Sequence, residues 1–255
     1  MMSINANKVK YIFSVLAFLF FVFYGYGAVE NNTEISVEVL LRRMEKAIDP
    51  TGTLTDSYTR ITRGVMCMPL QKFKANVIIK YKNPDKLLIK TTLEDGKYIV
   101  QAYNGKTGWK SSSGKKPVKM EGKELDSFRL GTALEGSQSR WYSLFRKMEI
   151  KKTDEKIGIY DCYKLTCYPK KEYNTSIPVV FYVDNKEYLI RKMELSVFSA
   201  VGIIAETIFV YKYKNFDNVL IPVETRTNVL KADVLYKISQ CIFNENISDS
   251  EFNFP

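Results

Sequence analysis

The carboxylates of this 255-residue chain are the side chains whose type could support general acid–base chemistry. Glycoside hydrolysis needs two of them facing each other across a cleft. Glu94 and Asp95 lie together at a turn, Glu121 and Glu124 share a helical stretch, and Asp184 stands alone at another turn. No spacing indicates that any two of these carboxylates meet. Paired-carboxylate hydrolysis is therefore a weak hypothesis.

Histidine is missing from the chain altogether. Its absence removes Ser-His and Cys-His nucleophile pairs, histidine metal sites and the commonest general base. The glycines occur singly at turns, so no phosphate-binding loop is visible. The cysteines lack metal-ligand spacing. We predict a protein that is not an enzyme, with no catalytic residue, no metal and no cofactor.

The amino terminus has the charged, apolar and small-residue order of a secretory signal peptide. Lys8 and Lys10 precede an apolar run from Tyr11 to Tyr24. We predict that residues 1–27 are a signal peptide and that residues 28–255 form a single domain in the periplasm. The alternative is an uncleaved inner-membrane anchor, because the run with its Gly25-Tyr26-Gly27 tail reaches the lower limit of roughly 17 residues that can span a bilayer.

Export would expose the four cysteines, Cys67, Cys162, Cys167 and Cys241, to an oxidising compartment. Cys162 and Cys167 are five positions apart, so in one strand they point to opposite faces and cannot bridge each other. We expect most of the cysteines to be small core residues, as free cysteines commonly are. A bridge that involves Cys67 or Cys241 remains open.

The formal net charge is +10, which raises the question of an anionic partner. The lysines are spread along strands and the chain is exported, so we expect no nucleic acid. Six of them share the polar row of the central strands: Lys72, Lys74, Lys80, Lys82, Lys86 and Lys90. We expect this row to face water and discourage edge pairing. Weak attraction to anionic lipid is the alternative.

The stretch from Lys72 to Lys110 has the alternating pattern of β-strands. In its first run Phe73, Ala75, Val77, Ile79 and Tyr81 are apolar between polar neighbours, and Ile78 alone breaks the period of two. Turn signals at Asn83-Pro84-Asp85, Glu94-Asp95-Gly96 and Asn104-Gly105 divide the stretch into strands. We predict a four-stranded antiparallel meander with one apolar face.

Helical periodicity is confined to two places. Residues 34–48, capped by Asn32 or Thr33, form an amphipathic helix, and residues 121–130 and 137–148 form two short helices in the middle of the chain. The remaining predicted strands are 54–66, 159–168, 177–184, 188–198, 203–214, 223–230 and 234–243. In the strand from 188 to 198, Arg191 is an exception on the buried face. We predict a mainly β (α+β) fold: one strongly curved antiparallel sheet of ten or eleven strands, with helices on its concave face.

Several stretches, in this order and spacing, carry a resemblance to a known family. They are the amino-terminal helix ending in Asp49-Pro50, MPLQKFKANVIIKYKNPDKLLIKTT (68–92), YNGKTGW (103–109), FYVDNKEYLIRKM (181–193), YKNFDNVLIPVETR (213–226) and the ending ISDSEFNFP. Together they resemble the LolA-like outer-membrane lipoprotein-sorting proteins, which share a fold with the LolB receptor and the sensor RseB. The resemblance covers most of the chain from Glu34 onward.

The resemblance implies a half-open barrel whose concave apolar face, covered by helices, holds acyl chains while a lipoprotein crosses the periplasm. The family also uses an arginine on an early strand to hold its lid closed, and Arg60 and Arg63 lie on the first strand here. The helical insert and the long basic strands resemble the divergent sorting-like proteins more than the dedicated carrier, so a partner exporter is not implied.

A carrier must hide acyl chains from water, which requires an apolar concave surface. The residues we predict to line it are Phe73, Val77, Ile79, Tyr81, Leu87, Ile89, Trp141, Phe145, Leu189, Met193, Leu195, Phe209 and Tyr211. The same pattern would arise in an ordinary core. Our leading prediction is a monomeric periplasmic carrier that binds lipoprotein acyl chains or phospholipid. The alternative is an RseB-like sensor or scaffold that binds a membrane protein.

Overall fold

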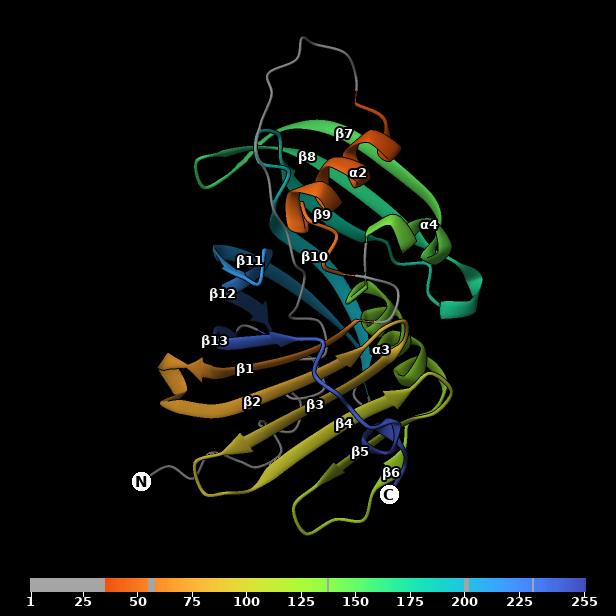
Figure 1. Cartoon of the computed structure of the whole chain (residues 1–255), viewed down its shortest axis with the longest axis vertical. Coiled ribbons are helices and arrows are strands. Elements are labelled where there is room, and N and C mark those ends of the chain that lie inside the picture. Colours follow the sequence, from red (N-terminus) through yellow and green to blue (C-terminus); the bar gives the residue numbers. More distant parts are fainter. Residues whose placement is uncertain (1–34, 55–57, 137, 200–201, 231) are drawn as a thin grey trace.

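The computed structural model describes residues 35–54, 58–136, 138–199, 202–230 and 232–255. The predicted signal peptide, residues 1–27, lies outside these ranges. In the described part of the chain, thirteen strands form a single antiparallel sheet that curves strongly on itself (Figure 1). The predicted fold class, mainly β with a curved antiparallel sheet, is confirmed. The predicted number of ten or eleven strands is too low.

One arm of the sheet follows the chain from β1 to β6. Its strands are β1 (Thr59–Met68), β2 (Phe73–Lys82), β3 (Lys86–Leu93), β4 (Tyr98–Asn104), β5 (Gly108–Ser112) and β6 (Val118–Lys119). The other arm comprises β7 (Phe145–Ile157), β8 (Tyr160–Pro169), β9 (Val179–Asp184), β10 (Ile190–Ser199), β11 (Gly202–Phe216), β12 (Val219–Val229) and β13 (Ala232–Phe243). Sequence neighbours pair within each arm, and β1 pairs with β13 to join the arms. Consequently β6 and β7 form the two free edges.

Two of these strands account for the low count. The short edge strand β6 has only two residues, which is too few for a visible period. Strand β7 begins at Phe145, inside a stretch that we predicted to be helical as far as Met148. That stretch pairs with β8, where Met148 lies opposite Cys167. The backbone N–H of Lys170 also donates to the carbonyl of Leu144 at 3.0 Å. Sheet pairing therefore overrides the helical pattern after Leu144.

The helices are α2 (Val37–Ile48), α3 (Gly122–Leu134) and α4 (Trp141–Leu144), with short 3₁₀ turns η2 (Pro69–Gln71), η3 (Gln138–Arg140), η4 (Lys171–Tyr173) and η5 (Asp249–Phe252). Helix α2 begins at Val37, three residues later than expected, because Ser36 provides its N-cap. The Ser36 Oγ accepts from the Val39 N–H at 3.2 Å. The predicted caps, Asn32 and Thr33, lie outside the described residues.

The helical segment 122–144 connects the two free edges of the sheet. It leaves β6 and enters β7, and α3 contacts both β4 and β10 on the way (Figure 1). Lys110 on β5 forms an ion pair with Glu124 at 2.5 Å, and the Phe198 N–H on β10 donates to the Ser127 hydroxyl at 3.0 Å. Helix α3 is therefore attached to both arms of the sheet.

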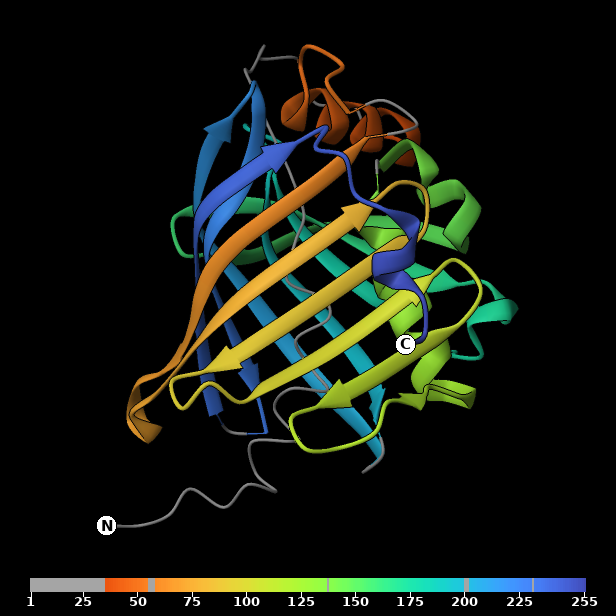
Figure 2. The same ribbon diagram turned by 60° about the horizontal axis from the view of Figure 1, so that its bottom comes forward.

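The carboxyl-terminal residues 247–253, which we name the C-terminal strap, cross the opposite, outer face of β2, β3 and β4 (Figure 2). Ile247 and Phe252 are buried there against Ile61, with Ile78 and Leu88 partly buried beside them. The strap explains why Ile78 interrupts the polar row of β2. An apolar residue on the outer face is covered by the strap instead of exposed to water.

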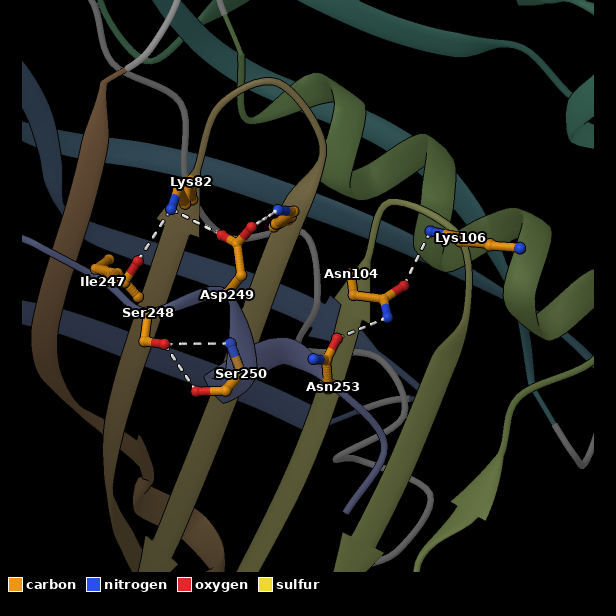
Figure 3. Close-up of polar contacts among 9 residues, drawn as sticks. Lys82, Asn104, Lys106, Ile247, Ser248, Asp249, Ser250 and Asn253 are labelled. Atoms are coloured by element: carbon orange, nitrogen blue, oxygen red, sulfur yellow. Dashed lines mark hydrogen bonds and ion pairs between the residues drawn. The ribbon is translucent and has the colours of Figure 1, made fainter.

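Polar contacts also hold the strap, as Figure 3 shows. Asp249 binds Lys82 and Lys86, each at 2.7 Å, and Asn253 accepts from Asn104 at 3.0 Å. In addition, the Trp109 Nε1–H donates to the Phe252 carbonyl at 2.8 Å. The lysines that we expected only to face water lie on the outer face, but three of the six, including Lys80 through Glu251, bind the strap.

The four cysteines are free, and three of them are buried. Cys167 belongs to the main apolar cluster, whereas Cys162 on the same strand β8 does not. The prediction of small core residues is confirmed for Cys167 and Cys241, which pack in this cluster, and Cys162 is buried outside it. In the described ranges, no helix is both long enough and apolar enough to cross a membrane.

Candidate functional site

The inner face of the sheet is the face that carries the main apolar cluster. Ten of the predicted lining residues are buried members of this cluster: Val77, Ile79, Tyr81, Leu87, Ile89, Trp141, Phe145, Leu189, Met193 and Leu195. Phe73 is partly buried against it. The structure thus brings together residues from both arms and from α4. The pleat of the strands accounts for this grouping, because alternate side chains share one face.

Trp141 on α4 connects the helical segment to the far arm. Its ring is fully buried and stacks on Phe181 of β9 with 4.4 Å between ring centres, and Phe145 contacts its edge at 6.1 Å. Phe181 is a member of the inner row that we did not predict. Every residue from Val179 to Val183 is apolar, so the sequence alone does not show that Phe181 and Val183 face inward while Tyr182 faces outward.

Two residues that we predicted to line the inner face lie on the outer face instead. Phe209 and Tyr211 lie on the other face of β11, where Phe209 is opposite Lys192 and Tyr211 is 54% exposed. The inner row of this strand consists instead of Ile204, Glu206 and Ile208. Almost every residue around 203–211 is apolar, so the sequence does not show which alternate residues face inward. Register shifts after Val210 then change which face each residue takes.

The two early arginines of β1 point to opposite faces. Arg60 is buried on the inner side and forms an ion pair with Glu135, which directly follows α3. Arg63 is partly exposed and donates to Gln240 on β13 at 3.2 Å. An odd spacing of three residues along a strand accounts for the difference. Arg60 is therefore the early arginine that contacts the helical segment.

The surroundings of Arg60 favour its charged form. Burial alone would lower the pKa of Arg60, but the charge and hydrogen bond of Glu135, together with Tyr58 and Cys241, raise it above its ordinary value. The Tyr58 hydroxyl donates to the Glu135 carbonyl at 2.9 Å, and burial raises the pKa of Tyr58 to about 12. The Arg60 guanidinium also lies over the Tyr81 ring, 5.6 Å from its centre. The ion pair is thus enclosed by two tyrosines.

A second contact joins the helical segment to the end of β2. The Tyr81 hydroxyl donates to Asn83 Oδ1 at 2.9 Å, and Arg140 of η3 donates to the same oxygen at 2.9 Å. Together, Tyr58, Arg60, Tyr81, Asn83 and Glu135 form what we name the Arg60 cluster. It connects β1 and β2 to the two ends of the turn between α3 and α4.

Tyr236 of β13 lies beside the Arg60 cluster on the inner face. Its ring occupies the space over Gly64, where an added Cβ would lie 2.7 Å from the Tyr236 oxygen and 2.5 Å from the Lys237 carbonyl. Burial raises the pKa of Tyr236, and the Glu135 charge adds to that effect. Glycine at position 64 is therefore required for this packing. The bulge between Arg63 and Gly64 marks the same place.

Arg191, the predicted exception on the buried face of β10, is buried but paired. It binds Asp184 at 2.6 Å, and its guanidinium lies 3.7 Å from the centre of the Tyr160 ring. A register shift between Ile190 and Lys192 interrupts the alternation at this residue. The ion pair between Arg191 and Asp184 therefore links β10 to β9 and stabilises this hairpin.

Across the described ranges, no group of three or more acidic or cysteine side chains is arranged to hold a metal ion.

Neither a protein-family model nor a curated protein matches the sequence. Solved structures do match the fold. A LolA superfamily protein from Nitrosomonas europaea aligns with a TM-score of 0.59 and 12% identity over 86% of this chain and 98% of that one. A domain assigned to outer membrane lipoprotein sorting, from Vibrio parahaemolyticus, aligns with a TM-score of 0.55 and 15% identity over 84% and 94% of the two chains.

The chain has a LolA-like fold. A DUF1329 family protein from Desulfovibrio piger also shares this architecture, with a TM-score of 0.56 and 14% identity over 84% of this chain and 94% of that one. The LolA-like fold accounts for the open curved sheet. At these identities the likeness concerns the fold.

Proposed function

We propose that this protein is a non-catalytic periplasmic carrier that holds acyl chains of lipoproteins or phospholipid against its inner face. The observation that carries the proposal is the inner row itself, which runs from Ile79 and Ile89 on one arm to Met193 and Leu195 on the other. The LolA-like fold supports it, since one solved neighbour is assigned to outer membrane lipoprotein sorting.

The free energy of acyl-chain burial is sufficient for such a role. Each buried CH₂ contributes about 0.8 kcal/mol, so one long chain supplies on the order of 10 kcal/mol before the costs of binding. The inner row offers aliphatic and aromatic side chains from both arms, and the helical segment with Trp141 covers part of that face. Apolar surface, rather than polar chemistry, is what this task requires.

The Arg60 cluster would control access to the inner face. Its ion pair joins β1 to the residue after α3, so breaking it frees the turn through which the helical segment continues toward Trp141. Opening would expose the apolar row, and an acyl chain would replace the contacts that the helices make. Arg60 would then act as the residue that holds the helical cover closed.

The test is native mass spectrometry of protein purified from the periplasm, combined with extraction and identification of bound lipid. Co-purified phospholipid, or uptake of an added acylated peptide, is the expected result. Protein that stays free of lipid after incubation would refute the carrier role. Lipid-free protein that retains a membrane protein on an affinity column would support the sensor alternative.

A further inference from the structure

Glu206 is an acidic residue on the otherwise apolar inner row of β11. It lies directly opposite Leu195 of β10 and Val229 of β12, and Ile204 and Ile208 flank it on the same strand face. All four neighbours belong to the main apolar cluster. Glu206 itself is only 2% exposed. A carboxyl group therefore lies inside the surface that we propose for acyl chains.

Two threonines of the neighbouring strand share this face. In β12, Thr227 is two residues before Val229 and Thr225 two residues before that, so both project to the same side as the partner of Glu206. Both threonines are buried. Within the described part of the chain, Glu206 Oε1, Thr225 Oγ1 and Thr227 Oγ1 have no hydrogen-bond partner.

Three unpartnered oxygens on two adjacent strands are unusual, because buried polar groups in folded proteins are nearly always hydrogen-bonded. They contribute nothing to the pairing of β11 with β12, which valines could maintain equally well. Their arrangement suits a polar group that comes from outside the chain. A small number of polar groups set in an apolar surface is typical of small-molecule sites.

The chemistry of these side chains limits what can bind. Burial raises the pKa of Glu206 well above its ordinary value, and no charged side chain is among the causes. A protonated carboxyl group and two hydroxyls can each donate and accept a hydrogen bond. With no cation beside them, they offer nothing to balance a phosphate or carboxylate.

We propose that Glu206 and its diagonal neighbour Thr227 bind the uncharged hydroxyl or amide group of an amphiphile whose acyl chain lies along the inner row, and that Thr225, one step further along β12, binds a second polar group of the same ligand. The site would favour acyl ligands with an uncharged polar end, and the phosphate of a bound phospholipid would lie outside it. It rests on the proposed function, because the apolar remainder of the ligand occupies the same surface. The side chains of Leu195 and Val229, which lie on either side of Glu206, would contact the first carbons of the chain.

Two ligands with the same acyl chain test the proposal: 1-monooleoylglycerol, with free hydroxyls, and methyl oleate, which cannot donate. Affinities of delipidated full-length mature protein are measured by native mass spectrometry and calorimetry. We expect 1-monooleoylglycerol to bind at least about tenfold more tightly, because a hydrogen-bonding site discriminates against an analogue without the group. Glu206→Gln should keep the preference, since an amide also donates and accepts, and Glu206→Leu should abolish it.

The outcomes separate the polar site from the carrier role. Equal affinity of the native protein for both ligands, or a preference unchanged in Glu206→Leu, would overturn the polar site and leave acyl binding intact. Binding of neither ligand would overturn both. Because Glu206→Leu could fail to fold, Thr227→Val serves as the near-isosteric second variant, and an unchanged preference there and in the Thr225→Val/Thr227→Val double variant would also count against the proposal.

Discussion

Arg60 on β1 and Glu135 after α3 form an ion pair whose side chains are 1% and 2% exposed. Strands β2 to β6 and helix α3 lie between the two residues along the chain. Their pairing brings the strand that joins both arms into contact with the segment that crosses between the free edges. A buried pair of this kind makes each partner dependent on the other.

Arg60→Ala should lower the free energy of unfolding by about 3–5 kcal/mol, because it leaves the Glu135 carboxylate buried without its counter-charge. Arg63→Ala on the same strand is the matched control, and we expect a change of roughly 0.5 kcal/mol or less, since that side chain is on the outer face. Urea unfolding followed by circular dichroism measures both. Equal losses for the two variants would contradict the assigned placement.

The double variant Arg60→Met/Glu135→Leu removes the ion pair without leaving either charge buried alone. It should recover most of the stability lost in Arg60→Ala, because well-packed apolar residues replace buried ion pairs at little cost. It should also exchange acyl ligand faster than the native protein if the pair holds the cover closed. If the stability loss of the double variant equals the sum of the losses in Arg60→Met and Glu135→Leu, the two residues do not interact.

The C-terminal strap should be a stabilising part of the domain. Phe252 is fully buried under the strap, so Phe252→Ala should cost about 3–5 kcal/mol of unfolding free energy. Phe254, two residues later, is 41% exposed, and Phe254→Ala is expected to have little effect. Thermal unfolding of both variants provides the comparison. A small effect at Phe252 would mean that the strap packs loosely.

The polar part of the strap should weaken in acid. Hydrogen bonds from Lys82 and then Lys86 lower the pKa of Asp249 from 3.8 to about 2. A depressed folded-state pKa gives a contribution that is present above about 3.8 and is lost as the pH falls through about 2. The stability difference between the native protein and Asp249→Asn should therefore shrink over that window. A constant difference from pH 5 to about pH 2 would argue against it.

Glu206 should make the folded state less stable as the pH rises, which is the opposite trend to that of Asp249. Burial raises its pKa above the ordinary value of 4.5, so the folded state binds the proton more tightly than the unfolded state. Stability is then lost as the pH rises above about 4.5 toward the folded-state pKa. Glu206→Gln cannot ionise, so its stability relative to the native protein should grow from pH 5 to pH 8. Melting curves across this range would disprove the assignment if the difference stayed flat.

The inner row was predictable wherever a strand has one clear period. Val77, Ile79 and Tyr81 alternate with polar residues, and the pleat places them together whatever the rest of the sheet does. Phe209 and Tyr211 were assigned to the wrong face because a nearly uniform apolar stretch does not show which alternate residues face inward. The inward position of Glu206 was hidden for the same reason, since it lies in the same stretch.

Contacts between distant segments could not be read from the sequence. Nothing local to Arg60 indicates that Glu135 is its partner, because that contact depends on how the crossing segment folds back. Likewise, Ile78 looked like an irregularity until the strap was seen to cover it. Phe145 has helical neighbours in the sequence, yet pairing with β8 decides its conformation.

The central claim is that an acyl chain lies along the inner row, and photo-crosslinking tests it most directly. Delipidated mature protein is incubated with a 1-monoacylglycerol that carries a diazirine in its acyl chain, irradiated and mapped by peptide mass spectrometry. We predict labels on inner-face residues such as Ile79, Ile89 and Met193. Labels confined to outer-face positions such as Ile78 or Tyr211, or no labelling, would contradict the account.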